Sequence, residues 1–92
     1  MEITFDFLYN NGFREEISEN ENKRLILKTD NYFIILTPEL DFNNKNYYRF
    51  DVYCEKYENN EITSQMTVTH VDNVMKLQQT FNYFGINLKL KV

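Results

Sequence analysis

The spacing of hydrophobic residues changes along the chain, and this change predicts two kinds of secondary structure. Between residues 23 and 69, apolar and polar side chains alternate with a period of two, which is typical of strands with one buried face. The segments concerned are KRLILKT (23–29), YFIILT (32–37), NYYRFDVYCEKY (46–57) and EITSQMTVT (61–69), with FREEIS (13–18) as a further short candidate. The connections TDN and ENN are typical of tight turns, so we expect an antiparallel meander of four or five strands.

From about residue 70 to 84, apolar residues recur at intervals of three and four, which predicts a helix with one apolar stripe. The stripe consists of Val71, Val74, Leu77, Phe81 and Phe84. Thr69 followed by Asp72 resembles a capping box at the start of this helix. Gly85 followed by Ile86 is typical of a helix that ends in a left-handed glycine. We therefore expect a core helix here.

The N-terminal segment TFDFLYNNGF (4–13) has two interpretations. Leu8, Gly12 and Phe13 have the same spacing as Phe81, Gly85 and Ile86 at the end of the C-terminal helix. This spacing favours a short helix starting at Thr4. The competing interpretation is a strand that enters a hairpin at the Asn-Gly pair. The residues that alternate in this second interpretation are Ile3, Phe5, Phe7 and Tyr9.

Together these elements predict an α+β domain in which both helices pack on one face of the sheet. That face is expected to carry Tyr48, Phe50, Val52, Cys54, Ile62, Met66 and Val68. The tail INLKLKV (86–92) also alternates and is expected to add a strand at the sheet edge. We expect a single domain, residues 1–92, because a division would leave each part too small a core.

Composition and charge argue against several classes of protein. Hydrophobic residues make up 42% of the chain and aromatic residues 16%, which is too much for a disordered protein. The net charge of −4 argues against a non-specific DNA-binding protein, which needs a basic surface. A single cysteine cannot form an internal disulfide, and the N-terminus lacks the pattern of a signal peptide, so we expect a cytoplasmic protein. No apolar run is long enough to span a bilayer, so no membrane partner is expected.

The sequence offers little for catalysis or for metal and cofactor binding. His70 and Cys54 are the only histidine and cysteine, so a zinc site of these ligands cannot be assembled. We expect a structural role for His70 at the strand-to-helix junction and burial for Cys54. Neither a calcium loop nor a glycine-rich phosphate loop is present. We therefore expect no catalytic residue, metal or cofactor; the less favoured alternative is an enzyme with His70 as its base.

A row of tyrosines with an arginine is the most distinctive candidate for a binding site. It alternates along the segment 46–57, on the face opposite to the helices, and consists of Tyr47, Arg49, Tyr53 and Tyr57. Tyrosine and arginine are favoured at protein interfaces. The same pattern can stack single-stranded bases, but Asp51 and Glu55 on that face would repel phosphates. In a simpler alternative, the tyrosines cover the back of the sheet or pack under the connection 38–46.

An acidic segment near the N-terminus is a second candidate contact. It contains Glu15, Glu16, Glu19 and Glu21, and Arg14 is the only base within residues 1–22. An acidic edge can meet a basic protein groove, although such a run is also typical of a solvated surface.

Two segments resemble those of small proteins encoded by phages and mobile genetic elements. THVDNVMKLQQTFNYFGINL (69–88) resembles a common ending in which a short helix runs into a glycine and an apolar strand, and FLYNNGF (7–13) resembles a common start. Some small acidic proteins of this kind inhibit host defence, including CRISPR effectors, by occupying a protein or ribonucleoprotein surface. The resemblance implies an inhibitor of this anti-CRISPR type in the cytoplasm of a bacterial host cell, and it implies no catalytic residue.

Two other functions stay open at this point. One is binding of single-stranded nucleic acid through the tyrosine face. The other is a self-associating structural protein in which the INLKLKV edge pairs between chains. We expect a monomer or a weak homodimer.

Overall fold

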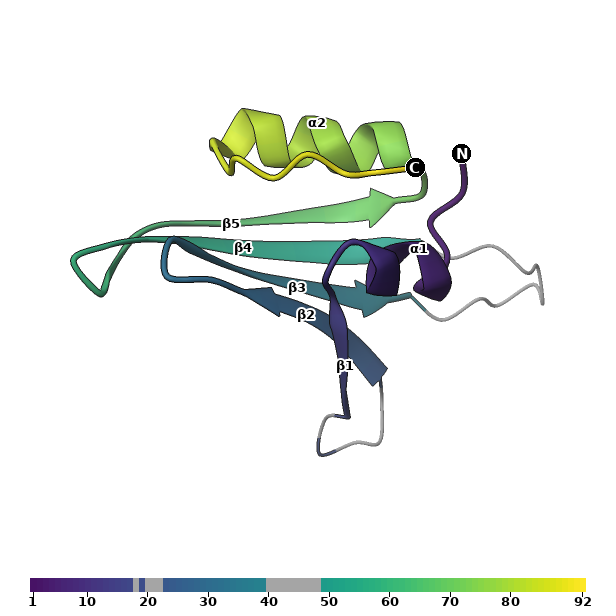
Figure 1. Cartoon of the computed structure of the whole chain (residues 1–92), viewed down its shortest axis with the longest axis horizontal. Coiled ribbons are helices and arrows are strands. Elements are labelled where there is room, and N and C mark those ends of the chain that lie inside the picture. The colour runs from purple at the N-terminus through teal and green to yellow at the C-terminus, as the bar shows by residue number, and fades with distance from the viewer. Residues whose placement is uncertain (18, 20–22, 40–48) are drawn as a thin grey trace.

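The structure, a computed structural model, describes residues 1–17, 19, 23–39 and 49–92 (Figure 1). Its elements are α1 (Phe5–Asn10), β1 (Arg14–Ile17), β2 (Lys23–Lys28), β3 (Tyr32–Pro38), β4 (Phe50–Glu58), β5 (Glu61–Val71) and α2 (Val74–Phe84). The five described strands form one sheet in the order β1-β2-β3-β4-β5, and each is antiparallel to its neighbour. The predicted α+β fold with an antiparallel meander is therefore confirmed.

One face of the sheet, which we call the core face, carries both described helices. The strand residues buried on this face are Leu25, Ile34, Leu36, Phe50, Val52, Cys54 and Val71. α1 reaches it through Phe5, whose ring centroid lies 6.4 Å from that of Phe50. α2 runs along β5 (Figure 1), and at its last turn the Lys56 amine donates to the Phe84 carbonyl over 3.3 Å. The hydrophobic core therefore lies between the helices and this single face.

Three phenylalanines join the helices to the sheet. Phe13 follows α1, Phe50 begins β4 and Phe81 lies in α2, and none of the three has exposed surface. Burial of one such ring contributes about 1.5–3 kcal/mol. Because each ring comes from a different part of the chain, this burial holds the separate elements together.

α1 confirms the helical interpretation of the N-terminal segment, and the strand interpretation is wrong. Thr4 is the N-cap, and its hydroxyl accepts a hydrogen bond from the Phe7 N–H over 3.1 Å. Beyond the helix, Gly12 has a φ of +93°, and the Phe13 N–H donates to the Leu8 carbonyl over 3.0 Å. Burial in this segment follows the helical period, so the Asn-Gly pair ends a helix instead of turning a hairpin.

α2 begins later than the sequence predicts, and the capping-box prediction is wrong. Thr69 lies in β5, which continues to Val71. The N-cap is Asn73, whose side-chain oxygen accepts from the Lys76 N–H over 2.9 Å. α2 is the longer of the two described helices, and neither of them is long and apolar enough to cross a membrane.

The end of α2 agrees with the glycine signal. Gly85 has a φ of +83°, and the Ile86 N–H donates to the Phe81 carbonyl over 2.9 Å. A Cβ atom at Gly85 would lie 3.0 Å from the Lys56 amine. Only glycine adopts this left-handed conformation at little cost.

The tail after α2 does not form the predicted edge strand. Its backbone is bonded to side chains: Gln78 donates to the Leu88 carbonyl and accepts from the Leu90 N–H, each over 2.8 Å. Asn11 accepts from the Lys91 N–H over 2.7 Å. The alternation seen in the sequence is real, because the tail turns its apolar residues toward the core. Its partners are the two helical segments and not the sheet edge.

β4 and β5 pair with two irregularities. At the first, two residues of β5 oppose Asp51, and one of them, His70, takes a left-handed φ of +61°. At the second, Thr63 is the extra residue of β5. This shift places Ile62 opposite Tyr57 and leaves it 52% exposed, so its predicted inward position is wrong.

We expect Asn73→Ala to lower the free energy of unfolding by about 1 kcal/mol, because it removes the acceptor for the Lys76 N–H. Thr69→Ala is the matched control, since Thr69 is exposed and lies outside the helix. Denaturant unfolding of both variants measures the difference. A loss for Thr69→Ala that equals or exceeds the loss for Asn73→Ala would contradict the cap assignment.

Candidate functional site

The face of the sheet opposite to the core face, which we call the open face, is the main candidate for a binding surface. Both described helices pack on the other side of the sheet. Cross-strand neighbours share a face, so the register defines the rows of the open face. From β2 to β5 these rows are Lys28, Phe33, Glu55 and Gln65; Ile26, Ile35, Tyr53 and Thr67; and Arg24, Thr37 and Asp51. Tyr57 and Ile62 extend the face toward the β4–β5 turn.

The centre of the open face is apolar. Ile26, Ile35 and Tyr53 form a continuous row from β2 to β4, and all three side chains are half-buried. Phe33 lies in the next row, and the Lys28 amine is 5.7 Å from its ring centroid, in the range of a cation–π contact. Exposed polar residues of β5 border this apolar centre.

Glu55 is a buried acid within the open face, and sequence reasoning missed its burial. It is only 8% exposed, although it lies on the face that neither described helix covers. In the register it stands between Phe33 and Gln65. Burial, followed by the charge of Glu55 and a hydrogen bond to it, raises the pKa of Tyr53. Tyr53 is therefore held as a neutral phenol beside this acid.

A second feature is the Glu39 cluster, which consists of Glu39, Arg49, Asp51 and His70. Glu39 follows β3, and its N–H donates to the Arg49 carbonyl over 2.8 Å. Its Oε2 lies 3.1 Å from Arg49 Nε, and its Oε1 accepts from the His70 N–H over 3.1 Å. His70 Nδ1 lies 2.8 Å from the same Oε1. One carboxyl group thus ties the end of β3 to the start of β4 and to the bulge of β5.

The two carboxyl groups of this cluster have pKa values that shift in opposite directions. Burial would raise the pKa of Glu39, but hydrogen bonds from His70 and Asp51 hold it below its ordinary value. Burial, followed by the hydrogen bond to Glu39 and the negative charge of Glu39, raises the pKa of Asp51. Asp51 therefore keeps its proton more readily, and its protonated carboxyl group donates a hydrogen bond to the Glu39 carboxylate.

The predicted row of tyrosines and arginine is only partly brought together among the described residues. Tyr53 and Tyr57 lie on the open face, and both are half-buried. Arg49 precedes β4 and belongs to the Glu39 cluster, so its guanidinium already has an acidic partner. Tyr47, together with Glu21 of the acidic set, lies outside the described residues.

The predicted acidic contact is divided between two sides of β1. Glu15 and Glu16 are successive strand residues and therefore point to opposite faces. Glu15 accepts a hydrogen bond from the Tyr9 hydroxyl, which raises the pKa of Tyr9 to about 12. Glu16 is ion-paired with Arg24. Glu19 is exposed in a turn beyond the strand.

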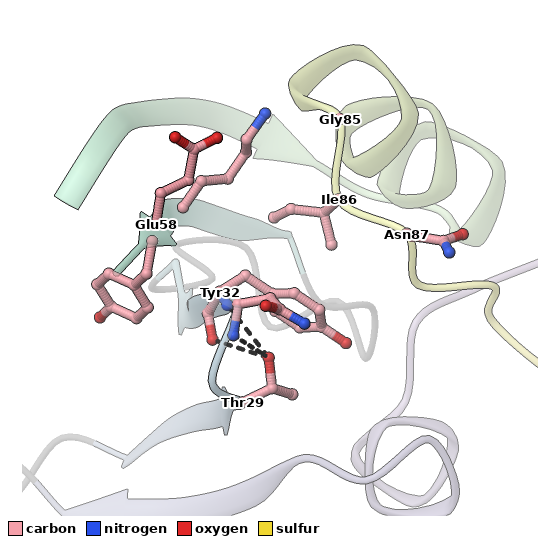
Figure 2. Close-up of a pocket in the computed structure, with 9 residues that line it drawn as sticks. Thr29, Tyr32, Glu58, Gly85, Ile86 and Asn87 are labelled. Atoms are coloured by element: carbon pink, nitrogen blue, oxygen red, sulfur yellow. Dashed lines mark hydrogen bonds between the residues drawn. The ribbon is translucent and has the colours of Figure 1, made fainter. Parts of the chain in front are cut away.

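A pocket of about 470 Å³ opens where the β2–β3 turn, the end of β4 and the residues after α2 meet (Figure 2). Tyr32 and Ile86 are among the lining residues shown in Figure 2. The Thr29 hydroxyl accepts from the Tyr32 N–H over 3.1 Å, and the Lys56 amine donates to the Phe84 carbonyl. These polar groups are bonded to the backbone of the surrounding fold.

Cys54 is buried, as predicted, and burial raises the pKa of its thiol to about 12. The thiolate is the reactive form of cysteine, so such a thiol is a poor nucleophile at neutral pH. Within the part of the chain that the structure describes, no three His, Cys, Asp or Glu side chains are placed to hold a metal ion.

We expect wild type to lose stability as the pH rises through the raised pKa of Asp51. Asp51→Asn should not show this loss. The raised pKa of Asp51 means that the folded state binds this proton more tightly than the unfolded chain does. The resulting stabilisation is complete below the ordinary aspartate pKa and is lost as the pH rises through the raised pKa. An asparagine amide cannot ionise, yet it can still donate a hydrogen bond to Glu39.

Denaturant unfolding between acidic and neutral pH checks this prediction. Wild type should lose stability relative to Asp51→Asn as the pH rises, whereas the exposed control Asp30→Asn should follow wild type. The lowered pKa of Glu39 makes wild type less stable in acid, and the same direction is expected for Asp51→Asn because its amide still donates to Glu39. A constant difference between wild type and Asp51→Asn across the range would show that the Asp51 pKa is not raised.

Comparisons with known proteins give no match to this chain among family models, curated proteins or solved structures. The open face presents apolar and aromatic side chains that neither described helix covers.

Proposed function

We propose that this chain is a binding protein without enzymatic activity, and that it occupies a protein or ribonucleoprotein surface through its open face. The observation that carries this proposal is the apolar and aromatic centre of a sheet face on which neither described helix packs. Contiguous apolar surface of this kind on a soluble domain is typical of an interaction site.

The chemistry of the open face suits a protein partner. Protein interfaces combine an apolar centre with a polar border. Here Ile35 and Tyr53 lie at the centre, while Gln65 and Thr67 are exposed at the border. Tyrosine loses little rotamer freedom on binding, and the contact between Tyr53 and Glu55 already restricts this side chain.

The distribution of charge favours a protein surface over a bare nucleic acid. Glu16, Asp51 and Glu55 lie on the open face, and the whole chain has a net charge of −4. Lys28 and Arg24 are bases on the same face, and Arg24 is already paired with Glu16. The face therefore carries acids and bases together and does not form the basic groove that single strands need.

The more specific version of the proposal is inhibition of a bacterial defence effector of the CRISPR type. Its support is the resemblance of residues 69–88 and 7–13 to small phage and mobile-element proteins, together with the acidic charge and small size of the chain. An acidic protein can occupy a basic surface on such an effector by charge complementarity.

The double variant Ile35→Ala/Tyr57→Ala tests the open face. In bacteria with an active CRISPR effector, wild type should restore plating of a targeted phage. The double variant should bind the effector at least about tenfold more weakly, because a loss of about 1.4 kcal/mol or more is typical when anchoring side chains of an interface are truncated. Binding to the purified effector complex and phage plating measure the two effects.

Tyr83→Ala is the matched control, because Tyr83 is 86% exposed on α2 and does not belong to the open face. It should bind like wild type, and thermal unfolding should show that all three proteins are folded. Equal binding by wild type and the double variant would rule out the open face as the contact. Steeply salt-dependent binding of a single-stranded oligonucleotide by the purified chain would favour nucleic acid over a protein partner.

A further inference from the structure

The two edges of the sheet differ in the way they are protected against pairing with other strands. β1, at one edge, is four residues long and carries three charged side chains, Arg14, Glu15 and Glu16. β5, at the other edge, is eleven residues long, and its stretch from Ile62 to Thr69 contains no charged residue and no proline. Natural edge strands are usually protected by shortness, charge or proline. β1 has such protection, and most of β5 lacks it.

The outer side of β5 has no strand partner within the described part of the chain. β5 ends the strand order, and its backbone ladder runs to β4 alone. Most of its side chains are exposed, including Gln65 and Thr67. Between the two bulges, the segment from Ser64 to Val68 keeps a regular register with β4 and therefore a regular outer edge. Such an edge presents a row of unpaired N–H and C=O groups.

We propose that β5 binds β5 of a second copy of this chain, in antiparallel orientation, about a two-fold axis at Met66. The pairs across the new contact are Met66 with Met66, Gln65 with Thr67, and Ser64 with Val68. This inference concerns the sheet edge and does not depend on the partner of the open face.

The side chains of β5 make this contact self-complementary. A two-fold axis at Met66 places core-face residues of one copy opposite core-face residues of the other. On the open face it places Gln65 of one copy opposite Thr67 of the other. No charge opposes a like charge, which matters for two copies that each carry a net charge of −4. β-branched residues, such as Thr67 and Val68, favour strand pairing. A contact between two identical strands requires this self-complementarity, whereas a contact with an unrelated strand does not require it.

There is space beside β5 for the side chains of an added strand. A groove of about 390 Å³ lies between β5 and α2, and its lining includes Met66, Val68 and Lys76. The Lys76 amine is 3.0 Å from Asp72 Oδ1, so its charge is already paired. Uncharged side chains of a second copy can therefore fill the groove while the Lys76 amine keeps its partner Asp72.

Sedimentation velocity over a wide range of protein concentration tests the proposal. Wild type should shift from monomer to dimer as concentration rises. Met66→Lys should remain monomeric, because two lysines would stand directly opposite each other at the axis. Ile17→Lys adds the same charge to a 64% exposed position on the opposite edge and should dimerise like wild type.

A cross-linking experiment keeps the test independent of any effect of lysine on folding. Met66→Cys should yield covalent dimers with a short thiol-specific cross-linker, because directly opposite Cβ atoms lie about 4.5–5.5 Å apart. The native Cys54 is buried and should not react, and Ile17→Cys is the matched control. A wild type that stays monomeric at all concentrations would overturn the proposal. So would dimers of Met66→Lys, or equal cross-linking through Ile17→Cys.

Discussion

The structure depends on the burial of one sheet face by two short helices. α1 and α2 are six and eleven residues long, and both pack against the core face. This contact buries the three large phenylalanines and fixes which side of every strand points inward. On the opposite face, which neither described helix covers, the aromatic centre is half-buried and Glu55 is buried between its cross-strand neighbours Phe33 and Gln65.

The parts of the fold that sequence predicts correctly are governed by neighbouring residues. The alternation of apolar and polar positions predicts the strands and, apart from Ile62, the inward faces of β2 to β5. The turns TDN and ENN predict the antiparallel pairs β2–β3 and β4–β5. The two glycines predict the helix ends because a left-handed residue is a local requirement. The position of Tyr53 and Tyr57 on the open face follows from the same alternation.

The features that sequence does not predict depend on distant contacts. The Thr69–Asp72 signal fails because β5 pairs with Phe50 as far as Val71, and this pairing delays the helix. The inward position of Ile62 fails because one extra residue in β5 shifts the register, a change that no local pattern reports. The Glu39 cluster joins residues from three separate segments, so its acids, its arginine and its histidine look unrelated in sequence. The tail alternates like a strand, but its backbone is hydrogen-bonded to the side chains of Gln78 and Asn11 and not to a sheet edge.

The contrast between the two sheet edges also limits how far the sheet can grow. A two-fold contact uses the β5 edge of both copies and leaves only β1 at each outer end. β1 is short, and its side chains Arg14, Glu15 and Glu16 carry charge. It is therefore a poor template for strand pairing with another chain. An assembly built on the proposed β5 contact would therefore close at two copies instead of continuing into a fibre.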